Sequence, residues 1–208
     1  MSKISLSPNA SGTGTFTIAS PNSSTDRTLT LPDNTGTILT SASNTNFPAG
    51  SVLQAVQATF TGTQTLATGG VNANFSDITS LSVTITPSSS SNKILLIAHL
   101  TSMCGDDRMI FFKFTGGNTS SFLGDTAGSR TRVAGFYGSG NAAGSANGAP
   151  VTLMYLDSPS TTSATTYKVQ GAPNYLSGSA YINYNPNETD NAYFCRGASS
   201  LIAIEVKG

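Results

Sequence analysis

Few residues of this chain could carry out acid–base or nucleophilic chemistry, and His99 is the first to consider. It is the only histidine among 208 residues, so a Ser-His-Asp triad would have to be built around it. His99 lies within the apolar run Lys93 to Thr101, which is typical of a strand, and no Gly-x-Ser-x-Gly turn stands nearby. We therefore expect a structural or interface histidine in a protein that is not an enzyme. A polysaccharide depolymerase is the enzymatic alternative, although no pair of acids suited to glycoside cleavage stands out.

Two acidic segments have the oxygen density of a calcium site. Asp106 and Asp107 follow Gly105, and Glu188 and Asp190 lie in an asparagine-rich segment. Carboxylate oxygens are the ligands that Ca²⁺ takes, but the same residues can equally cap turns. We expect neither a metal nor a cofactor, with a loop-bound ion as the alternative.

The two cysteines, Cys104 and Cys195, lie far apart in the sequence, and their spacing matches no zinc or redox motif. A disulfide between them cannot be deduced from the sequence. We expect two partly buried thiols, because disulfides are rare in reducing compartments.

Tyrosines are the better candidates for ligand binding. Four of them gather toward the end of the chain, with asparagines between them: Tyr175, Tyr181, Tyr184 and Tyr193, with Asn174, Asn183, Asn185 and Asn187. A tyrosine ring stacks on a sugar and an amide bonds its hydroxyls, so this set suits a host surface glycan. The alternative is that the tyrosines pack in the core or in a subunit interface.

The composition favours strands and turns over helices. Ser and Thr number 30 and 29, there are 21 glycines, and charged residues make up 10% of the chain. The formal net charge is zero, and Arg130 and Arg132 are the nearest thing to a basic cluster, so no nucleic-acid partner is expected. No segment approaches the ~20 apolar residues of a membrane span, and the N-terminus lacks an apolar signal core.

Residues 51–208 are predicted to form an antiparallel β-sandwich or jelly-roll-like body, so the fold class is all-β. The run Lys93 to Thr101 is predicted to be a central strand that is covered on both sides. The predicted strands are Ser51–Phe60, Ile78–Thr86, Lys93–Thr101, Met109–Phe114, Arg132–Tyr137, Val151–Leu156, Thr165–Gln170, Ser179–Tyr184 and Ser200–Val206. The glycine-rich stretch 115–149 is predicted to be loops that carry contacts.

Residues 1–41 are predicted to form a β-arm for attachment, which a linker, residues 42–50, joins to the body. Three short alternating runs, Gly14–Ala19, Arg27–Leu31 and Gly36–Thr40, are its predicted strands. Their apolar residues are too few to enclose one another, so the arm must bury them against other copies or another protein. The candidate attachment residues are Phe16, Ile18, Leu29, Leu31, Ile38 and Leu39.

The arm resembles a module near the N-termini of many tailed-bacteriophage structural proteins. The resemblance rests on Gly12 to Ile18, Arg27 to Asp33 and Gly36 to Ser41. A second resemblance, to a β-domain of cyanophage fibre-like proteins, rests on Asp77 to Pro87 and Ser90 to Leu96. In the rest of the body only the ending, Ser199 to Val206, looks familiar.

The resemblance implies a virion structural protein on the particle surface, assembled in the host cytoplasm. The undersized arm and the resemblance together favour a homotrimer that binds capsid or tail proteins. A capsid cement or head-fibre role is preferred because no long shaft repeat separates arm from body. The alternative is a short tail fibre whose tip binds a host glycan.

Overall fold

The computed structural model describes residues 10–15, 17–19, 21–30, 33, 35–36, 47–66, 74–104, 109–138, 147–174, 180–186, 190, 192 and 194–208. The chain divides into two units, Met1–Thr37 and Ile38–Gly208. The predicted limits of the arm, the linker and the body stay predictions. Within the described residues, no helix has the length and apolar character that crossing a membrane requires.

The described residues of the first unit are exposed, and none of them lies in a strand. The strands predicted over Gly14–Ala19 and Arg27–Leu31 are therefore wrong at their described positions. The reason is physical: alternation supplies a face, but a strand also needs a neighbour to complete its backbone hydrogen bonds. Most of the third predicted strand, residues 37–40, lies outside the described residues.

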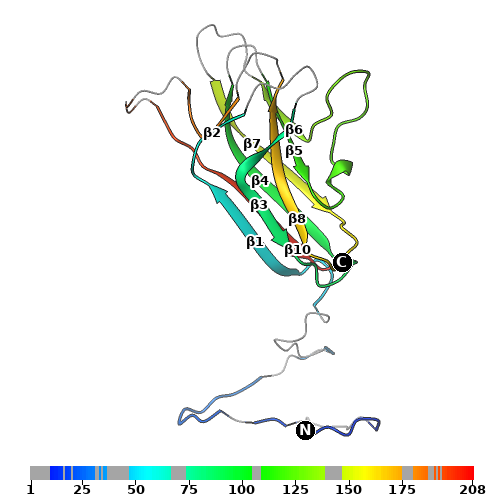
Figure 1. Ribbon diagram of the computed structural model, residues 1–208. Helices are drawn as coiled ribbons and strands as arrows, with labels where there is room; N and C mark the ends of the chain where they lie inside the picture. Colours follow the sequence, from blue (N-terminus) through cyan, green and yellow to red (C-terminus); the bar gives the residue numbers. More distant parts are fainter. Residues whose placement is uncertain are drawn as a thin grey trace. The chain divides into compact units, whose positions relative to one another are not determined.

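The second unit is a sandwich of two antiparallel sheets, which confirms the predicted fold class (Figure 1). Sheet A contains β1 (Val52–Phe60), β2 (Gln64–Leu66), β4 (Lys93–Cys104), β7 (Asn147–Asp157), β9 (Ala180–Ile182) and β10 (Ser199–Val206). Sheet B contains β3 (Ser76–Ile85), β5 (Met109–Thr115), β6 (Gly135–Gly138) and β8 (Thr165–Pro173).

The order of the strands is that of a jelly roll. Sheet A contains the order β1-β10-β4-β7 and sheet B the order β3-β8-β5-β6, the arrangement of a jelly roll, in which the chain crosses repeatedly between the sheets and β5 and β6 are neighbours in one sheet. Along one edge of β4, β10 pairs with its first half and β9 with its last residues, while β7 pairs with the other edge. The short strand β2 continues the sheet beyond β9.

The core lies between the two sheets and is built from one face of each strand. On β4 the inward residues are Ile94, Leu96, Ala98 and Leu100, all fully buried. The outward residues of β4 are half-buried or exposed, so the prediction that this strand is covered on both sides is wrong. Its central position is confirmed, because it pairs with a strand along each edge.

Two local differences separate the predicted strands from the observed ones. β6 begins at Gly135 rather than at Arg132, because residues 124–134 form a loop whose Ala134 N–H donates to the carbonyl of Phe112. β2 and the 3₁₀ turn η1 (Thr119–Ser121) were not predicted, since three residues are too few to show a period.

A buried carboxylate, Glu205, closes the end of the core at which β1 begins. It accepts hydrogen bonds from Gln54 Nε2 at 2.5 Å, Asn92 Nδ2 at 2.5 Å, and the Ser88 backbone N–H and hydroxyl at 2.6 and 2.8 Å. Burial raises the pKa of Glu205, but these hydrogen bonds outweigh it, so the pKa lies below its ordinary value. The carboxylate thus ties β10 to β1 and to the turn between β3 and β4.

A second buried carboxylate, Asp157, holds the turn that follows β5. It accepts the Tyr167 hydroxyl at 2.6 Å and the Asn118 backbone N–H at 3.1 Å. Burial, together with this neighbouring carboxylate, raises the pKa of Tyr167 far above its ordinary value. Gly117 has a positive φ of 50°, and a Cβ there would lie 2.2 Å from Asp157 Oδ2, so only glycine fits the turn.

Candidate functional site

Two of the four candidate tyrosines form one aromatic cluster, which we call the tyrosine pair. Tyr181 on β9 and Tyr184 just after it are edge to face, with ring centroids 5.3 Å apart and planes at 78°. The Tyr184 hydroxyl is 2.5 Å from Thr65 Oγ1 on β2. Both rings are half-buried, so part of each remains accessible to a ligand. Tyr175 and Tyr193 lie outside the described residues.

The backbone at Asn183 brings the tyrosine pair together. In a regular strand Tyr181 and Asn183 would share a face and Tyr184 would lie on the other. Asn183 instead has a positive φ of 65°, which asparagine tolerates better than most residues, and its side chain is buried. Its amide donates to the carbonyls of Phe60 and Gly62 at 2.8 and 2.9 Å and accepts the Ser199 hydroxyl at 2.7 Å.

The asparagines predicted to bond sugar hydroxyls are therefore not all on the surface. Asn183 is buried with its amide engaged, and Asn174 Oδ1 accepts the backbone N–H of Met109 at 2.8 Å. The prediction that the Asn183 amide faces a ligand is wrong, because it is buried and holds strand ends together, whereas for the half-buried Asn174 it stays a prediction. Asn187 lies outside the described residues.

A cationic group stands beside the tyrosine pair. The Arg196 guanidinium carbon lies 5.8 Å from the centre of the Tyr184 ring, and Arg196 pairs with Tyr184 through an isolated β-bridge. Arg196 is exposed. Two perpendicular rings and a guanidinium supply a stacking surface and donors, which is chemistry that can bind a sugar or an acidic group.

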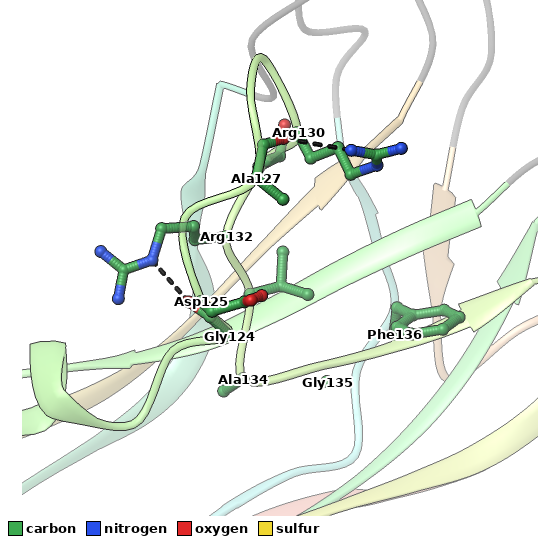
Figure 2. Close-up of a pocket in the computed structure, with 10 residues that line it drawn as sticks. Gly124, Asp125, Ala127, Arg130, Arg132, Ala134, Gly135 and Phe136 are labelled. Carbon is green, nitrogen blue, oxygen red and sulfur yellow. Dashed lines mark hydrogen bonds between the residues drawn. The ribbon is translucent and has the colours of Figure 1, made fainter.

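A hollow of about 290 Å³ lies on the loop between η1 and β6 (Figure 2). Asp125, Phe136, Arg130 and Arg132 contribute side chains to its lining. Arg130 Nη1 donates to the Ala127 carbonyl at 3.3 Å and Arg132 Nε to the Gly124 carbonyl at 2.5 Å. In the view of Figure 2 the two arginine side chains extend in opposite directions from the loop. Both arginines are exposed, and their charges do not converge on one point of the hollow.

The remaining candidates for chemistry do not gather into a site. His99 is exposed on the outer face of β4, between Ser200 and Thr152 of the neighbouring strands. Cys104 is buried, Cys195 is exposed, and both are thiols, so no disulfide joins them. Within the described ranges, no three His, Cys, Asp or Glu side chains form a group that could hold a metal. Asp106, Asp107 and Glu188 lie outside those ranges.

Two of the six candidate attachment residues can be placed. Ile18 is 75% exposed and Leu29 is 85% exposed. Phe16, Leu31, Ile38 and Leu39 lie outside the described residues.

A third surface was missed in the sequence, and we call it the apolar outer patch. It lies on the outer face of sheet A, where β10, β4 and β7 run side by side. In one row Ile204 pairs with Leu95 and Leu95 with Leu156, and in the next Ile202 pairs with Ile97 and Ile97 with Met154. The patch consists of Leu95, Ile97, Met154, Leu156, Ile202 and Ile204. The sequence does contain a signal for this patch. In Ile94–Ile97 and in Leu201–Ile204 every residue is apolar, so both faces of each strand are apolar there.

No protein-family model matches the chain, and a comparison with curated proteins finds no match. Among solved structures, the chain is similar to the infectious bursal disease virus Gt strain structure, with 13% identity and a TM-score of 0.34 over 77% of this chain and 39% of that one. It is also similar to the infectious bursal disease virus VP2 subviral particle, with 14% identity and a TM-score of 0.29 over 83% of this chain and 42% of that one. The chain thus spans about two fifths of the length of these structures. The jelly roll is established by the strand order itself.

Proposed function

We propose that this chain is a non-enzymatic structural protein of a bacteriophage virion. In this proposal it is a homotrimer on the particle surface, a capsid cement or head-fibre protein that the N-terminal arm fastens to capsid or tail proteins. The body is the projecting jelly roll.

The observation that carries the proposal is the exposure of the arm. Ile18 and Leu29 are 75% and 85% exposed in a unit whose described residues are all exposed and include no strand. Apolar side chains gain free energy when they leave water, at roughly 1.5–3 kcal/mol for each large side chain. A segment of this kind is stabilised when a partner covers it, and its sequence resembles the attachment module of tailed-bacteriophage proteins.

The proposal is tested by charging the apolar residues of the arm. Leu29→Asp together with Leu31→Asp is expected to leave the body folded and to abolish incorporation into particles, measured as copies per purified particle. Thr28→Asp together with Thr30→Asp is the matched control, because it places two carboxylates at the adjacent exposed positions. Normal occupancy by the leucine variant would show that the arm is not the anchor.

The tyrosine pair supports a second candidate, a short tail fibre that binds a host glycan. Its rings and Arg196 form a partly open aromatic and cationic surface. A glycan array with the purified chain would detect specific binding, which Tyr181→Ala is expected to remove. Tyr184→Phe is the matched control, since it keeps the ring and removes only the hydroxyl next to Thr65. An array without specific signal argues for the cement or head-fibre role.

A further inference from the structure

The apolar outer patch differs from the part of the other outer face that β3 and β8 form. Met154 and Leu156 on β7 are 58% and 50% exposed, and they lie beside half-buried leucine and isoleucine side chains of β4 and β10. On the outer face of sheet B the corresponding positions of β3 and β8 are Ser82, Thr84, Thr166 and Lys168. The β3–β8 half of that face is therefore polar, whereas its β5–β6 half carries the paired Phe111 and Phe136, of which Phe136 is 60% exposed.

We propose that the apolar outer patch is the surface through which copies of this chain associate. The inference deepens the proposed function, since it rests on the homotrimer in that proposal and names the face that forms it. A contiguous apolar surface on a folded domain marks an interaction site. Three sheets that face a three-fold axis would each cover part of the patch of both neighbours.

The charge of the patch favours a second copy as the occupant. None of its six members is charged, and the next outward row toward the loops is Ser200, His99 and Thr152. At the other end Lys93 Nζ donates to Ser158 Oγ at 2.8 Å. A contact between identical faces brings like groups together, so it is favourable only where those groups are neutral. The whole chain also has a formal net charge of zero, which removes long-range repulsion between copies.

The segment that precedes β1 leaves the body at the same end of sheet A as the patch. The Gly50 N–H donates to the Lys207 carbonyl at 2.8 Å, and the Lys207 N–H donates to the Ser51 carbonyl at 2.9 Å. Val52 then pairs with Val206 at the start of sheet A. The chain that leads to the arm therefore leaves the body at the apolar end of this sheet. Association through the patch would bring the Gly50 ends of several bodies toward one another.

The size of the patch indicates how strong the association should be. Three strands at ~4.8 Å spacing and two outward rows ~6.8 Å apart give a surface of about 200 Å². A stable interface covers about 800 Å² on each partner. The patch alone therefore supports weak association, and additional contacts by the arm would make the full-length chain associate more strongly than the patch area suggests.

The test is sedimentation velocity of the full-length chain over a range of micromolar concentrations. Wild type is expected to sediment as an oligomer, and Met154→Glu together with Leu156→Glu as a monomer. Ser82→Glu together with Thr84→Glu is the matched control, because it adds two outward glutamates to β3, the edge strand of sheet B. The control should remain an oligomer. A folded patch variant with the wild-type mass distribution, or a monomeric wild type, would overturn the proposal.

Thermal unfolding monitored by circular dichroism shows whether the variants fold. If the glutamate variant does not fold, Met154→Gln together with Leu156→Gln decides, because it removes the apolar surface without adding charge. A folded glutamine variant should associate several-fold more weakly, and unchanged association would contradict the proposal. Particle occupancy is a separate readout. If the wild-type chain is an oligomer but is absent from particles, only the proposed virion role is contradicted. If it is a monomer but is present in particles, only the proposed association through the patch is contradicted.

Discussion

On sheet A the outward side chains at the centre of β4, β7 and β10 are leucine, isoleucine and methionine, whereas on sheet B those of β3 and β8 are serine, threonine, lysine and glutamine. The inner faces of both sheets are mainly apolar and form one core, with buried polar groups such as Glu205 and Asp157 at its ends. Strand propensity alone does not explain the difference, since threonine and isoleucine both suit a pleated sheet. We therefore attribute the difference to what these strands meet: water at β3 and β8, and in our proposal another copy at β10, β4 and β7.

The largest change in the free energy of unfolding is expected on the inner face of β4. Leu96→Ala removes a fully buried side chain and should lower the free energy of unfolding by about 2–5 kcal/mol at any protein concentration. Ile97→Ala, on the outer face, should cost below about 1 kcal/mol in the dissociated chain. Urea denaturation at two protein concentrations measures both. Equal losses would mean that β4 is covered on both faces.

A smaller effect is expected at the buried carboxylate of sheet A. Glu205→Gln places an amide donor against the donors of Gln54 and Asn92, and should lower the free energy of unfolding at neutral pH by about 1–3 kcal/mol.

The pH dependence of this carboxylate follows from its lowered pKa. The stabilisation by Glu205 is fully present above its ordinary value of 4.5 and is lost as the pH falls through the lower folded pKa. Urea denaturation between pH 7 and pH 3 should show wild type losing more stability than the glutamine variant. Parallel pH profiles would contradict the assignment.

The exposed carboxylate of sheet B should contribute less. Asp77 accepts Lys168 Nζ at 2.7 Å and Gln170 Nε2 at 2.7 Å, which lowers its pKa, and the Asp77 and Lys168 side chains are both more than two fifths exposed. Lys168→Met should therefore lower the free energy of unfolding by less than about 1 kcal/mol. The loss should shrink further in high salt, measured by thermal unfolding at two ionic strengths. If Lys168→Met lowered the free energy of unfolding as much as Glu205→Gln does, the buried and the exposed carboxylate would contribute equally, contrary to the prediction.

The smallest change in stability is expected when sheet B is made to resemble sheet A. Thr84 and Thr166 pair across β3 and β8 with their hydroxyls 2.8 Å apart. Thr84→Val together with Thr166→Val keeps the β-branched shape and should change the free energy of unfolding by less than about 1 kcal/mol. It should also introduce new, weak association, measured by light scattering against wild type. If the mass distribution does not change, apolar outer surface alone is not enough for association.

The sequence predicted nine of the ten strands in the described part of the body because most of them have one mainly apolar face. Leu81, Val83 and Ile85 on β3 show that period plainly, and all three are buried. It did not predict β2, whose three residues are too short to show a period. In the arm it predicted strands where the described residues show none, because the alternating pattern says nothing about a neighbouring strand.

At the candidate site, too, the sequence predicted part of the arrangement and the structure supplied the rest. The sequence placed Tyr181 and Tyr184 near one another along the chain, but only the left-handed backbone at Asn183 puts their rings in contact. It assigned Asn183 to the surface, whereas three hydrogen bonds hold its amide inside.

By itself, then, the sequence determined the class of the fold, the positions of the strands and their inward residues, because these depend on local period and on the hydrophobic effect. Only the tertiary structure decided that β10, β4 and β7 lie side by side with their outward isoleucine, leucine and methionine residues aligned. That alignment depends on pairings between residues about sixty positions apart for β4 and β7 and more than a hundred apart for β4 and β10, which no local pattern encodes.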